Sequence, residues 1–176
     1  MPHSDFSNKP WMSRQIERTA PASVLDIGPG SGTYGRIVRD VAPEARLVGV
    51  EAWEPYIDEF ALRDVYDEIL VQDARELNDW SYDLVIFGDV LEHMSEADAS
   101  LLWAKAASGR GRVLMSIPII HYPQCAEHGN PYEVHVVEDW SHERVLDVFP
   151  GIVDFEVFAV TGAYLADFSS SFAVED

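Results

Sequence analysis

The chain has 176 residues, of which 47% are hydrophobic and one is cysteine, and its 31 acidic and 12 basic side chains give a formal net charge of −19 at pH 7. Nucleic-acid backbones are bound mainly by Lys and Arg, so this balance argues against DNA or RNA and favours a small neutral or cationic partner. Without a membrane-spanning apolar run, a leader-like start or a cysteine pair, we expect a single cytoplasmic domain over 1–176 that folds without disulfides and contacts no membrane.

Strand-like and helix-like segments alternate along most of the chain. An N-terminal arm over 1–21, helical from 5 to 19, comes first. The sequence then predicts strands at 24–27, 46–50, 68–72, 82–87 and 112–117, and helices at 33–42, 53–63 and 95–108. A helix over 141–149 and two strands near 152–160 and 163–172 follow. Such alternation indicates a parallel sheet with helices on both faces.

A glycine-dense turn, Gly28–Gly32, directly follows the first predicted strand. Glycines let a ligand approach backbone N–H groups, and the helix that begins near Thr33 aims its partly positive end at the same place. The spacing G-x-G-x-G lacks the third glycine of the dinucleotide fingerprint, because position 33 is threonine. The turn therefore favours a nucleoside ligand without a pyrophosphate over NAD.

Acidic residues follow the next three strands where each one ends. Glu51 ends the second strand, Asp73 follows the third, and Asp89 lies two residues beyond the fourth. In an open α/β sheet, ligands bind at these carboxyl ends, and an acid after the second strand can bind ribose hydroxyls.

Four segments together resemble the class I S-adenosylmethionine-dependent methyltransferases in order and spacing, over residues 22–118. They are Val24–Gly32, Val48–Glu51, Gln72–Ala74 and Tyr82–His93. The resemblance implies a three-layer Rossmann-like α/β fold, with a mostly parallel seven-stranded sheet and a C-terminal antiparallel hairpin. It also implies S-adenosylmethionine as cofactor and S-adenosylhomocysteine as product.

The resemblance assigns one group of residues to the cofactor. They are Asp26, Gly28, Gly30, Gly32, Glu51, Trp53, Asp73, Ala74 and Asp89. The glycine turn, supported by Asp26, would back the methionine part, and Glu51 would hold the ribose. Asp73 and Ala74 would meet the adenine, and Asp89 would lie near the amino-acid moiety. For Trp53, a place over the nucleoside and packing in the core are equal alternatives.

The segment 118–140 follows the fifth strand, so we expect it to form a lid over the cofactor mouth. Long loops without secondary structure are often binding loops, and its aromatic, histidine and carboxamide side chains suit a hydroxylated acceptor. It is similar to a segment of some bacterial methyltransferases associated with glycan modification, which implies a sugar-like acceptor. The candidate substrate residues are Tyr122, Asn130, Tyr132, Glu133 and Trp140.

Methyl transfer to a hydroxyl requires removal of a proton, for which histidine is the natural side chain near pH 7. His93 follows the fourth strand, and His121 and His135 belong to the lid, so these three are the candidate bases. For His93, support of the following helix is the alternative.

A divalent metal is a second way to activate an oxygen acceptor. Asp89-x-x-Glu92-His93, with His135, resembles the Glu-x-x-Glu-His pattern of small-RNA 2′-O-methyltransferases and some quinone-biosynthesis O-methyltransferases, but has aspartate at 89. Mixed oxygen and nitrogen ligands suit Mg²⁺ or Mn²⁺. Because Asp89 is also needed near the cofactor, we expect no metal, and turnover that persists in EDTA.

The sequence thus predicts methyl transfer to a small polar acceptor, most simply at a hydroxyl. With no separate substrate domain, the arm and residues 118–140 must supply specificity. Three alternatives stay open: transfer to nitrogen, a non-catalytic S-adenosylmethionine-binding module that regulates a partner, and an NAD-dependent enzyme, against which the missing glycine argues. The acceptor and the oligomeric state are not predicted.

Overall fold

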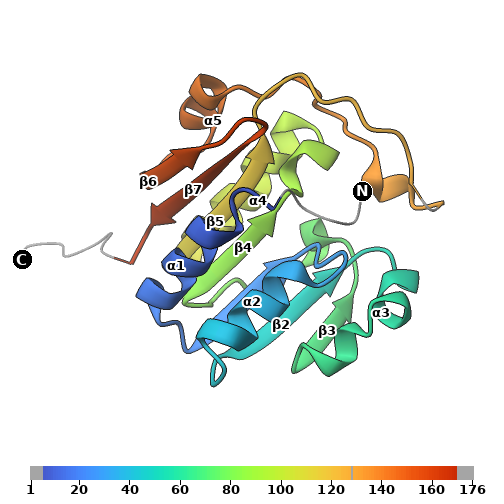
Figure 1. The fold of residues 1–176 in the computed structure, drawn as a ribbon, viewed down its shortest axis with the longest axis vertical. Coiled ribbons are helices and arrows are strands. Elements are labelled where there is room, and N and C mark those ends of the chain that lie inside the picture. Colours follow the sequence, from blue (N-terminus) through green and yellow to red (C-terminus); the bar gives the residue numbers. More distant parts are fainter. Residues whose placement is uncertain (1–5, 128, 170–176) are drawn as a thin grey trace, which may run out of the picture.

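The computed structural model describes residues 6–127 and 129–169, which form one seven-stranded sheet covered by helices (Figure 1). The strand order is β3-β2-β1-β4-β5-β7-β6, and β1 to β5 run parallel while β7 is antiparallel to both β5 and β6. The bounds are β1 Ser23–Ile27, β2 Arg46–Glu51, β3 Glu68–Val71, β4 Leu84–Gly88, β5 Arg112–Pro118, β6 Ile152–Val157 and β7 Thr161–Asp167. The predicted mostly parallel sheet with a C-terminal antiparallel hairpin is confirmed.

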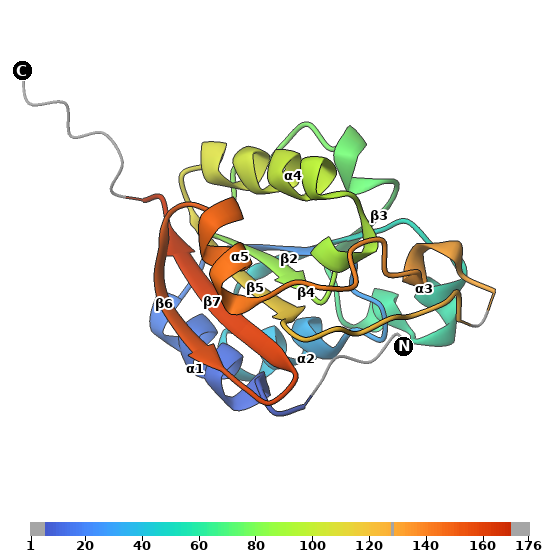
Figure 2. The ribbon, with the colours of Figure 1, turned by 90° about the horizontal axis from the view of Figure 1, so that it is seen from above.

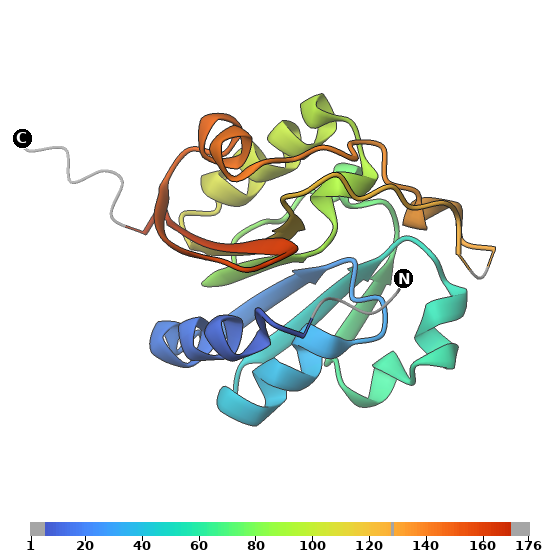
Figure 3. The ribbon, with the colours of Figure 1, turned by 45° about the horizontal axis from the view of Figure 1, so that its top comes forward.

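The helices cover both faces of the sheet and bury a separate core on each (Figure 3). They are α1 Lys9–Thr19, α2 Thr33–Val41, α3 Pro55–Glu59, α4 Glu96–Ser108 and α5 His142–Val148. One core holds Trp11, Tyr34 and Ile57 from α1, α2 and α3. The other holds Trp103 and Phe149 from α4 and the end of α5. The fold therefore has three layers: helices, the sheet, and helices again.

Helix ends follow local capping rules in two of the predicted helices. Ser95 and Ser141 precede α4 and α5, and each side-chain hydroxyl accepts a backbone N–H bond, from Asp98 at 3.1 Å and from Arg144 at 3.2 Å. Such caps satisfy N–H groups that the helix itself leaves without partners.

The predicted helix over 53–63 is wrong in length. The structure has a five-residue α3 and then a 3₁₀ turn, Leu62–Asp64, because Ala61 takes the left-handed conformation with φ 49°. The predicted strand over 163–172 is β7, which ends at Asp167, and residues 170–172 lie outside the described residues. The N-terminal helix begins at Lys9, and residue 5 of its expected span is also outside.

The carboxyl ends of β1 and β4 meet at the point where the strand order reverses. The chain runs outward through β2 and β3 on one side of β1, and through β4 and β5 on the other. Ligands of open α/β sheets bind at such a point. Within the described residues, no helix is both long and apolar enough to cross a membrane.

The segment between β5 and α5 extends away from the sheet and returns, with its far end beside α3 (Figure 2). Its two arms are joined by backbone bonds, from Tyr122 N–H to the Glu138 carbonyl at 2.8 Å and from His135 N–H to the Gln124 carbonyl at 3.1 Å. The predicted lid over 118–140 is therefore a closed loop with its own internal bonds. We call residues 119–141 the lid loop.

Candidate functional site

The glycine turn after β1 has a backbone that requires glycine. Gly28, Gly30 and Gly32 have φ values of 64°, 52° and 75°, a region that L side chains rarely adopt. A Cβ atom on Gly28 would lie 2.8 Å from Cγ2 of Val90. Without side chains, the glycines let a ligand approach the backbone of the turn closely, although Gly28 N–H already donates to the Val50 carbonyl at 2.9 Å and Gly32 N–H to the Pro29 carbonyl at 2.8 Å.

Glu51, at the end of β2, is only 5% exposed and is tied to this turn. Its carboxylate accepts the Gly30 N–H at 3.1 Å and the Trp53 N–H at 2.8 Å. Burial raises the pKa of Glu51, and the bond to Trp53 opposes that shift. The carboxylate therefore holds the turn and still has lone pairs for a further donor.

A cavity of about 380 Å³ lies at this end of the sheet, within the range of small-molecule sites. It brings together residues from the ends of β1 to β4 and from the lid loop. The sequence-predicted residues that line it are Gly28, Gly30, Glu51, Asp73, Ala74, Asp89, His93, Asn130, Tyr132 and Glu133. Lining residues that the sequence analysis did not select include Gln72, Arg75, Met94 and Val136.

Seven predicted site residues do not line the cavity: Asp26, Gly32, Trp53, His121, Tyr122, His135 and Trp140. Trp140 is 2% exposed and packs with Phe149 at 5.4 Å between ring centroids, so it is a core residue. His121 is exposed at the start of the lid loop. The structure therefore does not bring Trp140 to the cavity, because the chain has already turned back to α5 at that position.

Asp26 lies inside β1 and is 1% exposed. Its Oδ2 accepts the Tyr66 O–H at 2.5 Å. Burial raises the pKa of Asp26 to about 7, although the Tyr66 bond lowers it. Asp26 is therefore a buried group that Tyr66 binds, and it does not line the cavity.

Asp73 presents a charged carboxylate after β3. It accepts the backbone N–H of Arg75 at 2.8 Å and forms an ion pair with the Arg75 guanidinium. The side-chain bond from Arg75 is the main reason why the pKa of Asp73 is lowered. Both residues line the cavity, so a carboxylate held in a fixed orientation is available there to a hydrogen-bond donor of a ligand.

Asp89, after β4, is held by a chain of buried side chains that begins on α1. The Lys9 ammonium donates to the Tyr34 hydroxyl at 2.6 Å, which bonds Ser116 Oγ at 2.7 Å, and Ser116 donates to Asp89 Oδ1 at 2.8 Å. Asp89 has a φ of 57°. Its buried Oδ2 has no hydrogen-bond partner within the described residues, although Lys9 Nζ is 3.9 Å away. That oxygen suits a cationic group in the cavity.

The tip of the lid loop is fixed to α3. Tyr56 donates its hydroxyl to Glu133 Oε1 at 3.0 Å, and Gln124 Nε2 donates to the Glu133 carbonyl at 2.7 Å. Asn130 caps the turn by accepting the Tyr132 N–H at 2.9 Å. Glu133 and Asn130 are buried while Tyr132 is 48% exposed, so Tyr132 has the greater freedom to meet an acceptor.

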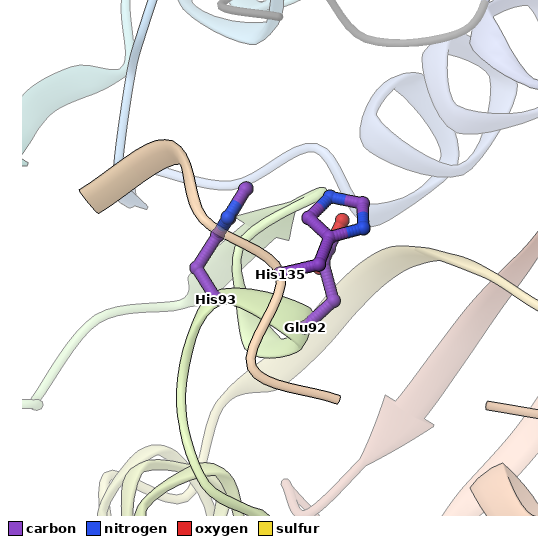
Figure 4. Close-up of side chains that lie close together, drawn as sticks. All are labelled: Glu92, His93 and His135. Atoms are coloured by element: carbon purple, nitrogen blue, oxygen red, sulfur yellow. The ribbon is translucent and has the colours of Figure 1, made fainter. Parts of the chain in front are cut away.

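His93 and His135 lie together beside Glu92, although they come from distant parts of the chain (Figure 4). Their ring centroids are 4.8 Å apart. One potential metal-ligand atom from each of the three residues lies within 4.8 Å of the others. Backbone bonds from Val136 and Val137 N–H to the Glu92 carbonyl, at 2.9 and 3.1 Å, hold the lid loop there.

Burial favours the uncharged form of all three side chains in this cluster. Burial lowers the pKa of His93 to about 4 and lowers that of His135. Burial also raises the pKa of Glu92 well above its usual value. His93 lines the cavity as well, so a neutral imidazole with an available lone pair lies at its edge.

Comparison with known proteins agrees with this geometry. Residues 8–147 match the family model described as a methyltransferase domain. The chain belongs to this family. It is therefore an S-adenosylmethionine-dependent methyltransferase, as the resemblance implied, and the match favours neither the NAD-dependent nor the non-catalytic alternative. At the sequence level, no curated protein matches the chain.

Solved structures of methyltransferases share the fold. A Burkholderia thailandensis 1,6-didemethyltoxoflavin-N1-methyltransferase, with its substrate and S-adenosylhomocysteine bound, has a TM-score of 0.70 at 16% identity, covering 94% of this chain and 80% of that one. A family 2 O-methyltransferase from Planctomyces limnophilus in complex with apigenin has a TM-score of 0.60 at 18% identity, covering 90% of this chain and 61% of that one. Human N-acetylserotonin methyltransferase in complex with S-adenosylmethionine has a TM-score of 0.62 at 14% identity, covering 92% of this chain and 51% of that one. The methyltransferase thus spans less than two thirds of the last two.

Proposed function

We propose that this methyltransferase transfers the methyl group of S-adenosylmethionine to a hydroxyl of a small polar acceptor, of a sugar-like kind. One observation carries the proposal. A single cavity joins the glycine turn and the acids Glu51, Asp73 and Asp89 to the neutral imidazole of His93 and the lid loop. A nucleoside fits the first set of groups, and a hydroxylated acceptor fits the second.

The residues fit the cofactor on three independent grounds. Gly28 and Val90 both line the cavity and pack so closely that a Cβ on Gly28 would lie 2.8 Å from Val90 Cγ2, so the turn keeps this shape with glycine there. Glu51 has lone pairs left for ribose hydroxyls after accepting two N–H bonds. The buried Asp89 Oδ2, without a hydrogen bond in the described part of the chain, suits the amino-acid ammonium. Asp73 and the Ala74 backbone then face the adenine.

S-adenosylmethionine supplies an already activated methyl group, so the protein must align the acceptor and accommodate its proton. Of the three predicted histidines, His93 alone lines the cavity. Its lone pair is available because burial keeps the pKa near 4 and the ring neutral. Asn130, Tyr132 and Glu133 lie at the same mouth and would orient the hydroxylated acceptor.

The proposal is tested by searching for the acceptor with isotopically labelled S-adenosylmethionine. Purified protein is incubated with S-adenosylmethionine carrying a ¹³CD₃ methyl group and a small-molecule extract, and products are identified by mass spectrometry. We expect one family of hydroxylated compounds to gain the labelled methyl group. Labelled products methylated at nitrogen alone would contradict the oxygen assignment, and protein that fails to bind S-adenosylmethionine would contradict the cofactor site.

Substituting Gly30 by valine should weaken S-adenosylmethionine binding by more than about tenfold, or about 1.4 kcal/mol. Valine strongly disfavours a φ of 52°, and its branched side chain would occupy the approach to the turn. Isothermal titration calorimetry measures the change. Gly129→Val is the control, because Gly129 also has a positive φ of 78° and nothing lies within 4 Å of an added Cβ. Equal affinities of Gly30→Val and the native protein would exclude a ligand at this turn.

A further inference from the structure

We propose that Glu92, His93 and His135 bind a divalent transition-metal cation at the edge of the cavity. These residues join the turn after β4, Leu91–His93, to the lid loop, and Figure 4 shows their side chains gathered in one place. One potential ligand atom from each lies within 4.8 Å of the other two. A small contraction brings three such atoms to the spacing that a shared cation requires.

Both imidazoles have their second nitrogen fixed by a backbone carbonyl. His93 Nδ1 lies 3.2 Å from the Val134 carbonyl, and His135 Nδ1 lies 2.6 Å from the Tyr122 carbonyl. A carbonyl only accepts, so each Nδ1 carries the proton and each Nε2 keeps its lone pair. Metal-binding histidines characteristically donate the other N–H to a carbonyl or carboxylate, which sets both tautomer and ring orientation.

Glu92 provides an independent observation that points to a ligand. Its side chain is 1% exposed, and Oε2 has no hydrogen-bond partner among the residues that the structure describes. A buried polar atom without a partner is costly. A cation bound by Oε2 would remove that cost, and two imidazole nitrogens would complete the ligand set.

The backbone of the cluster is organised before any ion binds. The Glu92 carbonyl accepts N–H bonds from both Val136 and Val137, the residues that follow His135. These bonds place the lid histidine against the turn that carries the other two ligands. Because the ligands need little reordering, the entropic cost of binding is small.

The donor set selects the class of metal. Mg²⁺ and Ca²⁺ prefer oxygen ligands, whereas two imidazoles and one carboxylate suit Zn²⁺ and its neighbours in the first transition row. Asp89 is not needed, because Ser116 holds its Oδ1 and its Oδ2 serves the cofactor. The sequence-based objection to a metal was that Asp89 cannot serve two sites, and this set of three avoids it.

The role of the cation rests on the proposed function. Three protein ligands leave a coordination position for an acceptor oxygen, and coordination lowers the pKa of a hydroxyl. Because His93 would then be a metal ligand and not the proton acceptor, the O–H proton would leave to solvent. The oxygen forms a bond to the methyl carbon as the bond from that carbon to the sulfonium sulfur breaks, and neutral S-adenosylhomocysteine leaves.

Metal binding is tested directly on untagged protein that has been stripped with a chelator. Zn²⁺ and Co²⁺ are titrated by calorimetry and by the visible absorption of bound Co²⁺, in excess Mg²⁺ that occupies the exposed carboxylates. Two variants remove one ligand atom each: Glu92→Gln keeps the shape, and His135→Asn keeps a donor for the Tyr122 carbonyl while removing Nε2. His142→Gln is the control, because His142 bonds Tyr164 at 3.0 Å and lies outside the cluster.

We expect one tight site per chain in the native protein and in His142→Gln, weakened more than about 100-fold in each ligand variant. S-adenosylmethionine binding to metal-free protein is measured in parallel. Retained cofactor binding without a tight metal site would overturn the metal proposal alone, as would tight binding that survives both ligand variants. Loss of cofactor binding in the native protein would instead overturn the proposed function. If one ligand variant fails to fold, the other decides.

Discussion

Replacing Glu51 by alanine should weaken S-adenosylmethionine binding by about 10²–10⁴-fold. The carboxylate has lone pairs for the two ribose hydroxyls, and each charge-assisted bond contributes about 1.5–3 kcal/mol, or about 3–6 kcal/mol together. The same carboxylate accepts the Gly30 N–H, so its removal also loosens the glycine turn. Isothermal titration calorimetry at pH 7.5 measures the affinity.

Glu51→Gln is the matched control because it keeps the length and shape of the side chain. One amide oxygen still accepts a hydrogen bond, so its affinity should fall between those of the native protein and Glu51→Ala. Both variants should stay folded, since each removes a carboxylate whose burial raises its pKa and disfavours its charge. Unchanged affinity in Glu51→Ala would remove Glu51 from the cofactor site.

Asp26→Asn should stabilise the protein increasingly as pH rises from about 4 to 7. An unfolded aspartate titrates near pH 3.9, whereas burial raises the pKa of Asp26 to about 7 in the folded chain. Below about pH 4 both states hold the proton, so the carboxyl adds no pH-dependent difference. Between the two values the unfolded state alone ionises, so the native protein loses stability relative to the variant, by about 4 kcal/mol above pH 7.

Thermal unfolding at a series of pH values measures this difference. For a chain of this size, 4 kcal/mol corresponds to a separation of about 10 °C in Tm at pH 8, shrinking toward a constant offset at pH 4. Asparagine retains an oxygen that accepts the Tyr66 O–H. Tyr66→Phe is the complementary variant. Loss of that bond should raise the pKa of Asp26 further, so the pH range over which stability falls should extend to higher pH. A Tm difference that does not vary with pH would contradict the assignment.

The half of the cavity that we assign to the cofactor could be predicted from the sequence because local rules determine it. A buried strand followed by Gly28–Gly32 fixes a turn, and acids at strand ends meet wherever parallel strands end together. The turn and Glu51, Asp73 and Asp89 accordingly line one cavity. The sequence does not show how deeply Glu51 lies, and the structure buries it against the turn, 5% exposed.

The half that we assign to the acceptor could not be predicted to the same degree, because contacts between distant segments determine it. His121 and His135 are equivalent candidates in the sequence. Bonds from Val136 and Val137 to the Glu92 carbonyl bring His135 to the cluster, while His121 stays exposed. No local pattern records those bonds.

Lys9 shows a related limit of sequence reasoning. It is a cation in an amphipathic arm, where a solvent-facing position is the ordinary expectation, yet it is 8% exposed and reaches the chain of hydroxyls that ends at Asp89. The aromatic ring of Tyr34, 4.1 Å from its ammonium, compensates part of the lost hydration.

That buried lysine would couple α1 to a cationic ligand in the cavity, because both would contact Asp89. The Lys9 ammonium and a ligand cation would share one carboxylate, since Lys9 Nζ lies 3.9 Å from Asp89 Oδ2. A change in cofactor affinity caused by detaching α1 must equal the change in docking of α1 caused by the cofactor. Although α1 contributes no residue to the cavity wall, a change in how it docks would therefore alter the affinity for a cationic ligand at Asp89.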